Sequence, residues 1–282
     1  MHFCDKITYI CAKIEIKRIQ HFTEVFTVLK FFKTVTSEYG YLDSLLRSND
    51  PLDIILVCLA FLAIAFIAYF LGSINFAIII SSIKYKDDIR GHGSKNAGMT
   101  NMMRTYGKKA AIITLVGDSA KAIVACMVGY LIMGHFGAFV AGLFCMLGHI
   151  FPIYYGFKGG KGVATAFTAA CMTDPLAFLI IILLFITMVA IWRYISLASI
   201  TCFGLYPLVL AFTSKLLTGL SGESRISVGI PFAILMAILI VFKHWENIQR
   251  LRSGTESKFK FKKSVKAPSK TAQDDSASNG EK

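Results

Sequence analysis

Long apolar runs, separated by short polar and basic loops, make up most of the chain after about residue 54. Several runs reach the roughly 20 residues that an α-helix needs to cross a bilayer, so they are predicted to be membrane helices. The run 163–173 is too short to cross lipid and is expected to lie inside the bundle as a half-helix. The predicted fold class is an all-α, polytopic integral membrane helical bundle of about seven spans. The expected segments are 54–80, 110–133, 136–156, 163–173, 175–192, 195–213 and 227–242.

The composition agrees with this class. Of the 282 residues, 55% are hydrophobic, and the mean hydropathy is +0.60, whereas soluble domains contain fewer apolar residues. The net charge of +13 is therefore read as a signal for membrane topology and anionic lipid, and not for nucleic acid. Five of the seven cysteines lie in apolar segments and none forms a C-x-x-C pair, so they are expected to be small hydrophobic filler.

The chain divides into three regions by composition. Residues 1–50 mix basic, acidic and aromatic residues without a signal-peptide pattern. They are predicted to be a surface-lying or disordered extension, with a mis-assigned start as the alternative. Residues 51–253 are expected to form the membrane domain. Residues 254–282 are lysine-rich and then polar, which predicts a disordered basic tail near the anionic inner leaflet.

Basic residues follow the predicted spans in alternation. They gather in the loop 84–109, in the turn 156–161, at Arg193 and after residue 243. By the positive-inside rule these loops share the cytoplasmic side, and the N-terminus lies outside. The Lys and Arg residues of 1–50 oppose that orientation, although so long a segment partly escapes the rule.

A glycine-rich loop, residues 156–162, joins two apolar segments. Glycines let backbone N–H groups turn toward one point, and a helix predicted to begin at Val163 would add free N–H donors and a positive dipole end. Lys161 adds a full charge, so the loop is a candidate phosphate site; the alternative is a flexible turn with membrane-anchoring lysines. It is not a Walker loop, because Gly162 follows Lys161 where Ser or Thr would hold magnesium.

The loop 84–109 carries a dense set of hydroxyl, amide and guanidinium groups between residues 91 and 104. If a helix starts at Thr100, the side chains of Asn101, Arg104 and Lys108 share one face. The guanidinium fork of arginine suits phosphate oxygens. The loop is thus a second candidate anion site, and the alternative is a solvated connector.

A third polar cluster, residues 243–251, follows the last span. On a helix His244 and Asn247 point together, and Glu246 can pair with Arg250 on another face. Histidine accepts a proton near neutral pH, so His244 is a candidate base; the alternative is an interfacial histidine beside an aromatic belt.

Polar residues also occur inside the predicted spans. A charge at the midplane costs roughly 3 kcal/mol, and Asp118 and Lys121 at i and i+3 can neutralise each other. We favour a structural ion pair over a proton relay. His149 is expected to be a hydrogen-bonded core histidine, and Ser196 and Ser199 are within reach of the site. Together the clusters predict a membrane-embedded pocket with two anion sites and a base.

From Leu71 to Glu256 the chain resembles the acyl-phosphate-dependent glycerol-3-phosphate acyltransferases of bacterial membranes (PlsY-type). The family motif G-S-x-N-x-G-x-x-N-x-x-R is present at 93–104, G-H-x-F-P followed by F-K-G-G-K-G-V-A-T at 148–165, and H-x-E-N-I followed by G-T-E at 244–256. Four positions depart from the usual Gly, Pro, Ala and Arg of the family: Lys95, Ala97, Met99 and Trp245.

The resemblance implies a reaction in which acyl phosphate and sn-glycerol 3-phosphate give 1-acylglycerol 3-phosphate and phosphate. This is the first acylation step of phospholipid synthesis, at the cytoplasmic face of the bacterial inner membrane. It requires no cofactor or metal, and no nucleic acid is expected as a partner. Expected partners are glycerol 3-phosphate, acyl phosphate, membrane lipid and the soluble enzyme that makes acyl phosphate.

The resemblance also implies roles for individual residues. Phosphates at the reacting centre would be held by Ser94, Arg104 and Lys161, and His244 with Asn247 would orient or deprotonate the attacking hydroxyl. Whether His244 or a substrate phosphate takes the proton stays open. The expected catalytic residues are His244, Asn247 and Ser94. The expected substrate-binding residues are Arg104, Lys161, Asn96, Asn101, Ser196, and Gly159, Gly160 and Gly162 as a cradle for acyl phosphate. The expected structural residues are Glu246, Asp118 and Lys121.

Two other functions are weighed against this one. A transporter for phosphorylated metabolites should show inverted repeats with broken helices in both halves, and one glycine-rich break is evident. A magnesium-dependent lipid phosphate enzyme should show clustered carboxylates, which the loops lack. The sequence therefore favours the acyltransferase.

Overall fold

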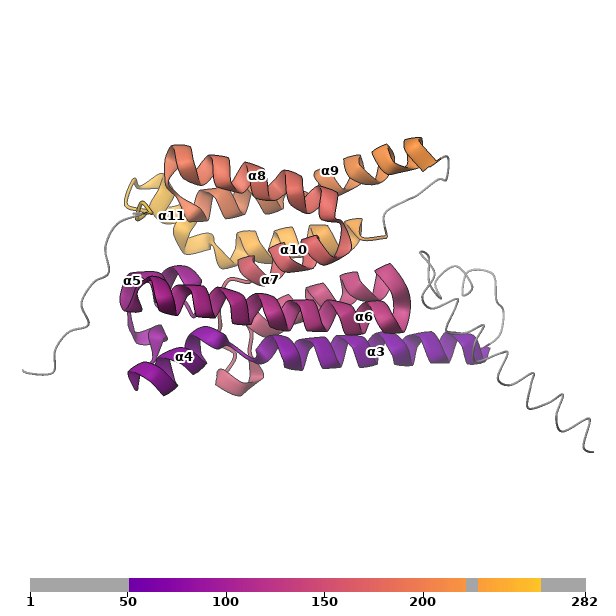
Figure 1. Ribbon diagram of the computed structural model, residues 1–282, viewed down its shortest axis with the longest axis horizontal. Helices are drawn as coiled ribbons and strands as arrows, with labels where there is room; N and C mark the ends of the chain where they lie inside the picture. Colours follow the sequence, from indigo (N-terminus) through magenta and orange to yellow (C-terminus); the bar gives the residue numbers. More distant parts are fainter. Residues whose placement is uncertain (1–50, 222–227, 260–282) are drawn as a thin grey trace, which may run out of the picture.

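The computed structural model describes residues 51–221 and 228–259, and every regular element in that part of the chain is a helix (Figure 1). The predictions for residues 1–50 and for most of the basic tail lie outside the described residues. The long helices and their connectors are α3 (Pro51–Ser73), α4 (Phe76–Tyr85), α5 (Met99–Tyr106), α6 (Lys108–Ile150), α7 (Val163–Thr173), α8 (Pro175–Trp192), α9 (Ile195–Ser221), α10 (Ile230–Lys243) and α11 (Trp245–Arg252), with single 3-10 turns η1 (Ile89–Gly91) and η2 (Ile153–Tyr155).

Helix α6 is a helical hairpin. Its regular dihedral angles break at Met133 and at Gly134, which has a φ of 57°. The Nζ atom of Lys121 lies 3.0 Å from Nδ1 of His149, 28 residues later, whereas a straight helix would separate them by about 42 Å. The chain therefore reverses at Gly134, and the two arms correspond to the segments expected at 110–133 and 136–156.

Small residues allow α3 to pack closely against the second arm of α6. A Cβ atom on Gly72 would lie 2.1 Å from the carbonyl oxygen of Cys145, and one on Gly148 would lie 2.1 Å from that of Tyr69. Contacts between backbones at this range are typical of small residues at membrane helix interfaces. The hydroxyl of Tyr69 also donates to the carbonyl of Phe151 at 2.8 Å. The α3 helix is thus held along the arm that ends at the glycine-rich loop.

Helix α7 is the predicted half-helix. Its 11 residues rise only about 16 Å, roughly half the thickness of the hydrocarbon core. It lies between the layer containing α3 and α6 and the layer containing α8, α9 and α10 (Figure 1). Phe167 of α7 packs with Phe203 and Ile181 in the largest buried cluster. Because protein surrounds α7 on these sides, its N-terminus is held inside the bundle.

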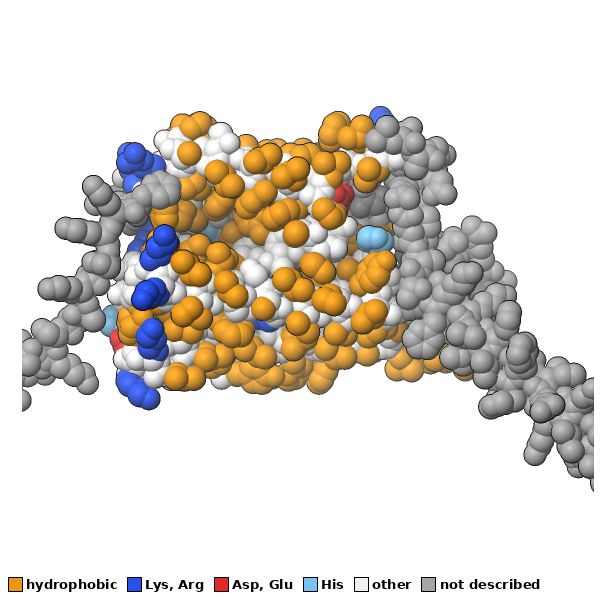
Figure 2. All heavy atoms as spheres, viewed as in Figure 1, with side chains coloured by type: hydrophobic (Ala, Val, Ile, Leu, Met, Phe, Trp, Pro, Cys, Tyr) orange, Lys and Arg blue, Asp and Glu red, His pale blue; other side chains and the backbone are white. Residues whose placement is uncertain are grey.

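The fold class is confirmed as an all-helical membrane bundle. In the described part of the chain four helices are long and apolar enough to cross a membrane, or five if α10 and α11, bent by 58°, count as one span. The hairpin of α6 is counted there once, so the expected number of about seven spans is compatible with these helices. The face seen in Figure 2 is covered with apolar side chains, and its Lys and Arg residues gather mostly at the end that carries α5 and α11.

Candidate active site

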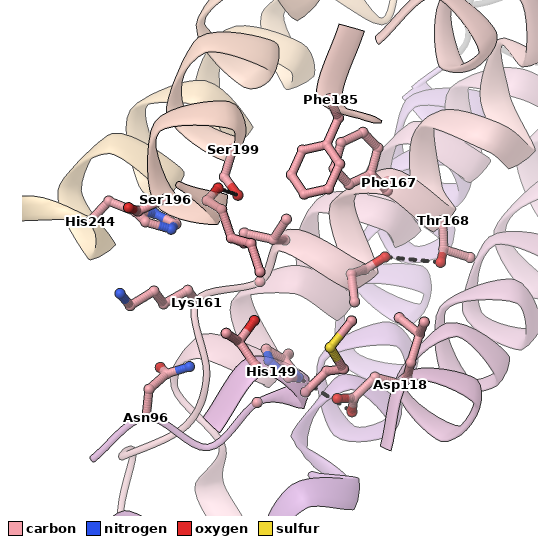
Figure 3. A pocket seen from close by; sticks show the side chains of 18 of the residues that line it. Asn96, Asp118, His149, Lys161, Phe167, Thr168, Phe185, Ser196, Ser199 and His244 are labelled. Carbon is pink, nitrogen blue, oxygen red and sulfur yellow. Dashed lines mark hydrogen bonds and ion pairs between the residues drawn. The ribbon is translucent and has the colours of Figure 1, made fainter. Parts of the chain in front are cut away.

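A cavity of about 590 Å³ lies where α5, α6, α7, α8, α9 and α11 meet. Polar residues from loops and helix ends gather in one part of its wall. Mostly apolar residues from helix interiors, with Asp118 and Thr168 among them, line the rest (Figure 3). The polar group contains Ser94, Asn96, Arg104, Lys161, Ser196, His244, Asn247 and Glu256. The apolar group includes Leu115, Ile123, Phe167, Phe178, Ile182 and Phe185. The cavity therefore suits a ligand with an anionic head and an alkyl tail.

The start of α7 supplies free donors to the polar part. Gly162 precedes the helix with a φ of +79°, and no side chain caps it. The first helical bond runs from the N–H of Ala166 to the carbonyl of Gly162, so the N–H groups before it have no partner within the helix. Gly162, Val163 and Ala164 all line the cavity. This helix start, predicted from the sequence, is an anion-binding feature.

Lys161 brings a cation to the same place. Its ammonium donates to the side-chain oxygen of Asn247. Burial, and after it the charge of Arg250, lower the pKa of the Lys161 side chain to about 8. A half-buried cation gains by binding an anion, because the anion compensates for lost hydration.

The N–H groups of Gly159 and Gly160 are already bonded. They donate to the carbonyl oxygens of Ile150 at 3.2 Å and His149 at 3.1 Å, and so tie the loop to the end of α6. A Cβ atom on Gly160 would lie 2.1 Å from Nε2 of His149. These two glycines thus serve close packing here, and their N–H groups are taken up by these bonds. The N–H groups without a partner in a helix are those at the start of α7, after Gly162.

The loop before α5 contributes Ser94, Asn96 and Arg104 to the cavity. The helix begins at Met99, one residue before the predicted start. It ends before Gly107, whose φ of +87° separates it from α6. Lys108 therefore belongs to α6, and the expectation that it shares a helix face with Arg104 is wrong.

Asn101, expected to bind substrate, is instead the centre of this loop. Its amide nitrogen donates to the carbonyl oxygens of Ile89, His92 and Asn96 at 2.9–3.2 Å. Its amide oxygen accepts from the N–H of Ser94 at 3.0 Å. The side chain is buried and does not line the cavity. Asn101 thus shapes the loop that presents Ser94 and Asn96.

His244 stands at the bend between α10 and α11. The two helices break there, so His244 and Asn247 do not share one continuous helix as expected, yet both reach the cavity. Nδ1 of His244 lies 2.8 Å from the carbonyl oxygen of Ile240. A carbonyl can only accept, so in the neutral ring Nδ1 carries the hydrogen and Nε2 keeps its lone pair. This tautomer leaves Nε2 free to accept a proton, but burial and then the charge of Lys161 lower the pKa of the His244 side chain to about 4, so it is a weak base in the free enzyme.

Glu256 joins three segments around the site. Its Oε1 accepts from Ser196 and Asn247 at 2.7 Å, and its Oε2 accepts from Nε of Arg250 at 2.7 Å. Burial alone would raise the pKa of this carboxyl, but the hydrogen bonds from Arg250, Ser196 and Asn247 hold it below its usual value. The side chain of Glu246, expected to be structural, is 83% exposed, and its Oε2 lies 3.7 Å from Nη1 of Arg250. This is a long, solvent-exposed ion pair, which contributes little to stability. Sequence reasoning gave Glu256 no role beyond its place in a motif.

Comparison with known proteins decides the family. The chain matches the profile of a family described as glycerol-3-phosphate acyltransferase over residues 62–254. It belongs to the glycerol-3-phosphate acyltransferase family. A glycerol-3-phosphate acyltransferase of Finegoldia magna is 41% identical over 193 residues, which cover 68% of this chain and 92% of the relative. One of Coxiella burnetii is 40% identical over 205 residues, covering 72% of this chain and 100% of the relative.

A solved structure supports the same assignment. The crystal structure of PlsY (YgiH), an integral membrane glycerol 3-phosphate acyltransferase, in its glycerol 3-phosphate form matches with a TM-score of 0.61 and 34% identity. The match covers 71% of this chain and 96% of that chain. The protein is therefore a multi-pass membrane glycerol-3-phosphate acyltransferase.

In this acyltransferase residues 255–259, here called the strap, follow the matched residues and line the cavity through Glu256, Ser257 and Phe259. The N–H of Phe259 donates to the carbonyl of Arg193 at 2.6 Å, and Lys258 stands 5.7 Å from the ring centre of Tyr194. Glu256 and Phe259 both line the cavity. The strap thus fixes Glu256 against the loop between α8 and α9.

Proposed function

We propose that this acyltransferase uses acyl phosphate as its donor. It transfers the acyl group to the sn-1 hydroxyl of glycerol 3-phosphate and releases phosphate and 1-acylglycerol 3-phosphate. The observation that carries the proposal is that Lys161 and the start of α7 adjoin an apolar groove in the same cavity. An acyl phosphate has both an anionic head and an alkyl tail, and this cavity has a complementary part for each. Membership of an acyltransferase family argues against the transporter alternative.

The acyl phosphate is assigned to Lys161 and α7. Its phosphoryl group would lie at Lys161 and at the N–H groups of Val163 and Ala164. Phe167, one turn further along the same helix, is in the apolar groove with Phe185. The phosphoryl group and the alkyl chain of the donor would both contact α7. The acyl carbonyl between them would therefore be held at one position along this helix, as catalysis by positioning requires.

The glycerol 3-phosphate is assigned to the loop before α5. Arg104 offers a guanidinium fork for its phosphate, and Ser94 and Asn96 line the same side of the cavity. Asn101 supports this site indirectly by holding the loop. With two cationic groups in one cavity, two phosphate-bearing substrates can bind side by side.

The reaction is an acyl transfer between two oxygens. The sn-1 hydroxyl oxygen attacks the acyl carbon and forms the ester bond. The bond from that carbon to the phosphate oxygen breaks, and phosphate leaves with the electron pair. The hydroxyl proton goes to Nε2 of His244 or to a phosphate oxygen. Because the donor is already activated, no covalent enzyme intermediate is needed, and positioning can supply up to about 7–11 kcal/mol of the barrier reduction.

Asn247 and Ser196 have supporting roles in this proposal. Asn247 holds the ammonium of Lys161 with its oxygen and donates to Glu256 with its nitrogen. Ser196 donates to the same carboxylate. Glu256 thereby positions both residues, and they in turn orient the groups that contact substrate.

The proposal also has a cellular setting. The end of the bundle rich in Lys and Arg would face the cytoplasm of a bacterium, in the inner membrane, where glycerol 3-phosphate is dissolved. A soluble enzyme that makes acyl phosphate would deliver the donor to this end. Residues 51–259, which include Glu256, would suffice for catalysis, with 1–50 and 260–282 as additions.

A donor comparison tests the function. Purified protein in lipid nanodiscs is given radiolabelled glycerol 3-phosphate with either palmitoyl phosphate or palmitoyl-coenzyme A. The expected result is labelled 1-acylglycerol 3-phosphate and equimolar phosphate with the first donor only. Turnover with palmitoyl-coenzyme A and none with palmitoyl phosphate would contradict the proposed donor. A Lys161→Met variant, checked for folding by size-exclusion chromatography, serves as the inactive control.

A further inference from the structure

Three ionisable side chains form a buried cluster that the proposed reaction leaves without a role. Nζ of Lys121 lies 2.9 Å from Oδ1 of Asp118 and 3.0 Å from Nδ1 of His149. All three residues are at most 5% exposed. The ion pair expected from the sequence at i and i+3 is confirmed, and His149 joins it from the other arm of the α6 hairpin. Asp118 and His149 also line the cavity (Figure 3).

Lys121 has a structural task as well. Its ammonium donates to the carbonyl oxygens of Gly72 at 2.9 Å and Ile74 at 2.5 Å. These carbonyls lie at the break between α3 and α4, where a helix end leaves acceptors without intrahelical partners. The cluster is therefore anchored to a second helix, and its geometry is held from two sides.

The position of Lys121 selects one tautomer of His149. An ammonium has three N–H donors, and two of those of Lys121 go to the carbonyls of Gly72 and Ile74. Oδ1 of Asp118 accepts no hydrogen bond within the described residues, so the third N–H is assigned to Nδ1 of His149 at 3.0 Å, which accepts it. The neutral ring then carries its hydrogen on Nε2. The carboxylate of Asp118 is farther from Nδ1, at 3.5 Å, and is the counter-ion of the lysine. His149 is thus prepared as a neutral N–H donor at Nε2, the opposite tautomer to that of His244.

Among the residues that the structure describes no hydrogen bond reaches Nε2 of His149. The buried side-chain atom without a partner there is Oδ1 of Asp118, so Nε2 is not sealed in the core but has access to the cavity that His149 lines. Nε2 lies beside Gly160, because a Cβ atom there would be 2.1 Å away. Gly160 immediately precedes Lys161, so Nε2 of His149 lies next to the loop that carries the candidate cation. Figure 3 shows His149 and Lys161 on neighbouring parts of the cavity wall.

We propose that His149 is a further anion-binding residue, whose Nε2–H donates to a phosphoryl oxygen held at Lys161, and that Lys121 is the positioning residue that sets its tautomer. The proposal rests on the proposed function for the identity of the anion, the donor's phosphoryl group before transfer and phosphate after it. A neutral donor adds a directed hydrogen bond to the leaving group without another buried charge. It also explains why residue 160 must lack a side chain.

Two substitutions of His149 separate this role from packing. In His149→Gln an amide nitrogen reaches roughly the position of Nε2, whereas in His149→Asn the amide reaches only that of Nδ1. Inorganic phosphate is titrated calorimetrically into each purified protein in nanodiscs. We expect His149→Asn to weaken phosphate binding about tenfold, which is 1.4 kcal/mol, and His149→Gln to stay within about threefold of the parent. Equal phosphate affinity in His149→Asn and the parent, or equal losses in both variants, would overturn the proposal.

A spectroscopic measurement covers the case in which His149→Asn does not fold. Nitrogen NMR of isotope-labelled histidine in the parent, assigned by difference from His149→Gln, should show a neutral ring protonated at Nε2 that shifts on addition of phosphate. A signal protonated at Nδ1, or one indifferent to phosphate, would refute the assignment. Lys121→Met should redistribute the two tautomers of His149, and an unchanged signal would show that Lys121 does not set the tautomer.

Glycerol 3-phosphate serves as the second titrant. We expect its affinity to change less than that of phosphate in His149→Asn, since its phosphate is assigned to Arg104. If only glycerol 3-phosphate binding weakens, His149 serves the acceptor substrate and the assignment fails. Turnover of palmitoyl phosphate by the parent is measured separately. Its absence, with phosphate binding that still depends on His149, would refute the proposed reaction and leave the binding site standing.

Discussion

The ammonium of Lys161 donates to the side-chain oxygen of Asn247, 86 residues further along the chain. This bond joins the glycine-rich loop to the bend between α10 and α11. Through Asn247 it continues to Glu256 and from there to Ser196 and Arg250. The candidate cation is therefore held by a network that spans three separate segments, and the predictions below probe its parts.

The charge of Lys161 should set the alkaline limit of activity. Because burial lowers its pKa from the usual 10.5 to about 8, the charged form prevails below that pH and is lost above it. We expect kcat/KM for acyl phosphate to fall as the pH rises through about 8, measured in the free-enzyme regime at low substrate. Lys161→Arg keeps its charge to much higher pH and should abolish that fall. A parallel decline in Lys161→Arg would assign the titration to another group.

Removal of the Glu256 charge should disturb both stability and catalysis. Glu256→Gln keeps the shape but loses the charge-assisted bond from Arg250, so we expect the free energy of unfolding to drop by about 2 kcal/mol. The rate should fall because Asn247 and Ser196 lose their common acceptor. Glu246→Gln is the matched control, since that carboxylate is exposed, and it should match the parent in both thermal unfolding and turnover. If Glu256→Gln and Glu246→Gln change stability and turnover equally, Glu256 is not the group that holds the network together.

Substitution of His244 tests whether this residue is the proton acceptor. With Nδ1 bonded to the carbonyl of Ile240, Nε2 is the available base, and its loss in His244→Ala should lower kcat by about 10²–10⁴-fold with little change in either KM. The measurement is a two-substrate steady-state analysis. A fall in kcat of less than about tenfold would instead point to a substrate phosphate as the base.

Gly160→Ala should displace the loop that carries Lys161. The new methyl group would stand 2.1 Å from Nε2 of His149 and 2.7 Å from the carbonyl oxygen of Ala97, so the loop must shift. We expect a raised KM for acyl phosphate with kcat less affected, the pattern of lost uniform binding. Gly204→Ala is the control, because no atom lies within 4 Å of its Cβ position. If only the KM for glycerol 3-phosphate rises, the two phosphate assignments are reversed.

The three polar segments should face the cytoplasm together. Single cysteines are placed at Lys95, Phe157 and Gln249, which belong to the loop before α5, the glycine-rich loop and α11. A membrane-impermeant maleimide applied to intact cells should label none of them and should label all after the cells are opened. Labelling of any one from outside would contradict the predicted orientation of the bundle.

Several features were determined by the sequence itself. Apolar runs of about 20 residues predict membrane spans because the bilayer thickness sets their length, and the shorter run 163–173 predicts the buried half-helix α7. The helix start after Gly162 follows from local chemistry, since glycine tolerates the positive φ found there. The motifs around Ser94, Lys161 and His244 indicated which residues meet. All of these depend on segment length or on neighbouring residues.

The tertiary structure decided which polar groups are still free. The side chain of Asn101 makes its hydrogen bonds within its own loop, and the bond from Phe259 to Arg193 holds Glu256 at the site. His149 meets Lys121 only because α6 reverses at Gly134. Such contacts join residues far apart in the chain, and hydrogen bonds need a donor and acceptor within about 3 Å and in line. Spacing along the sequence does not determine that geometry; the packing of the helices does.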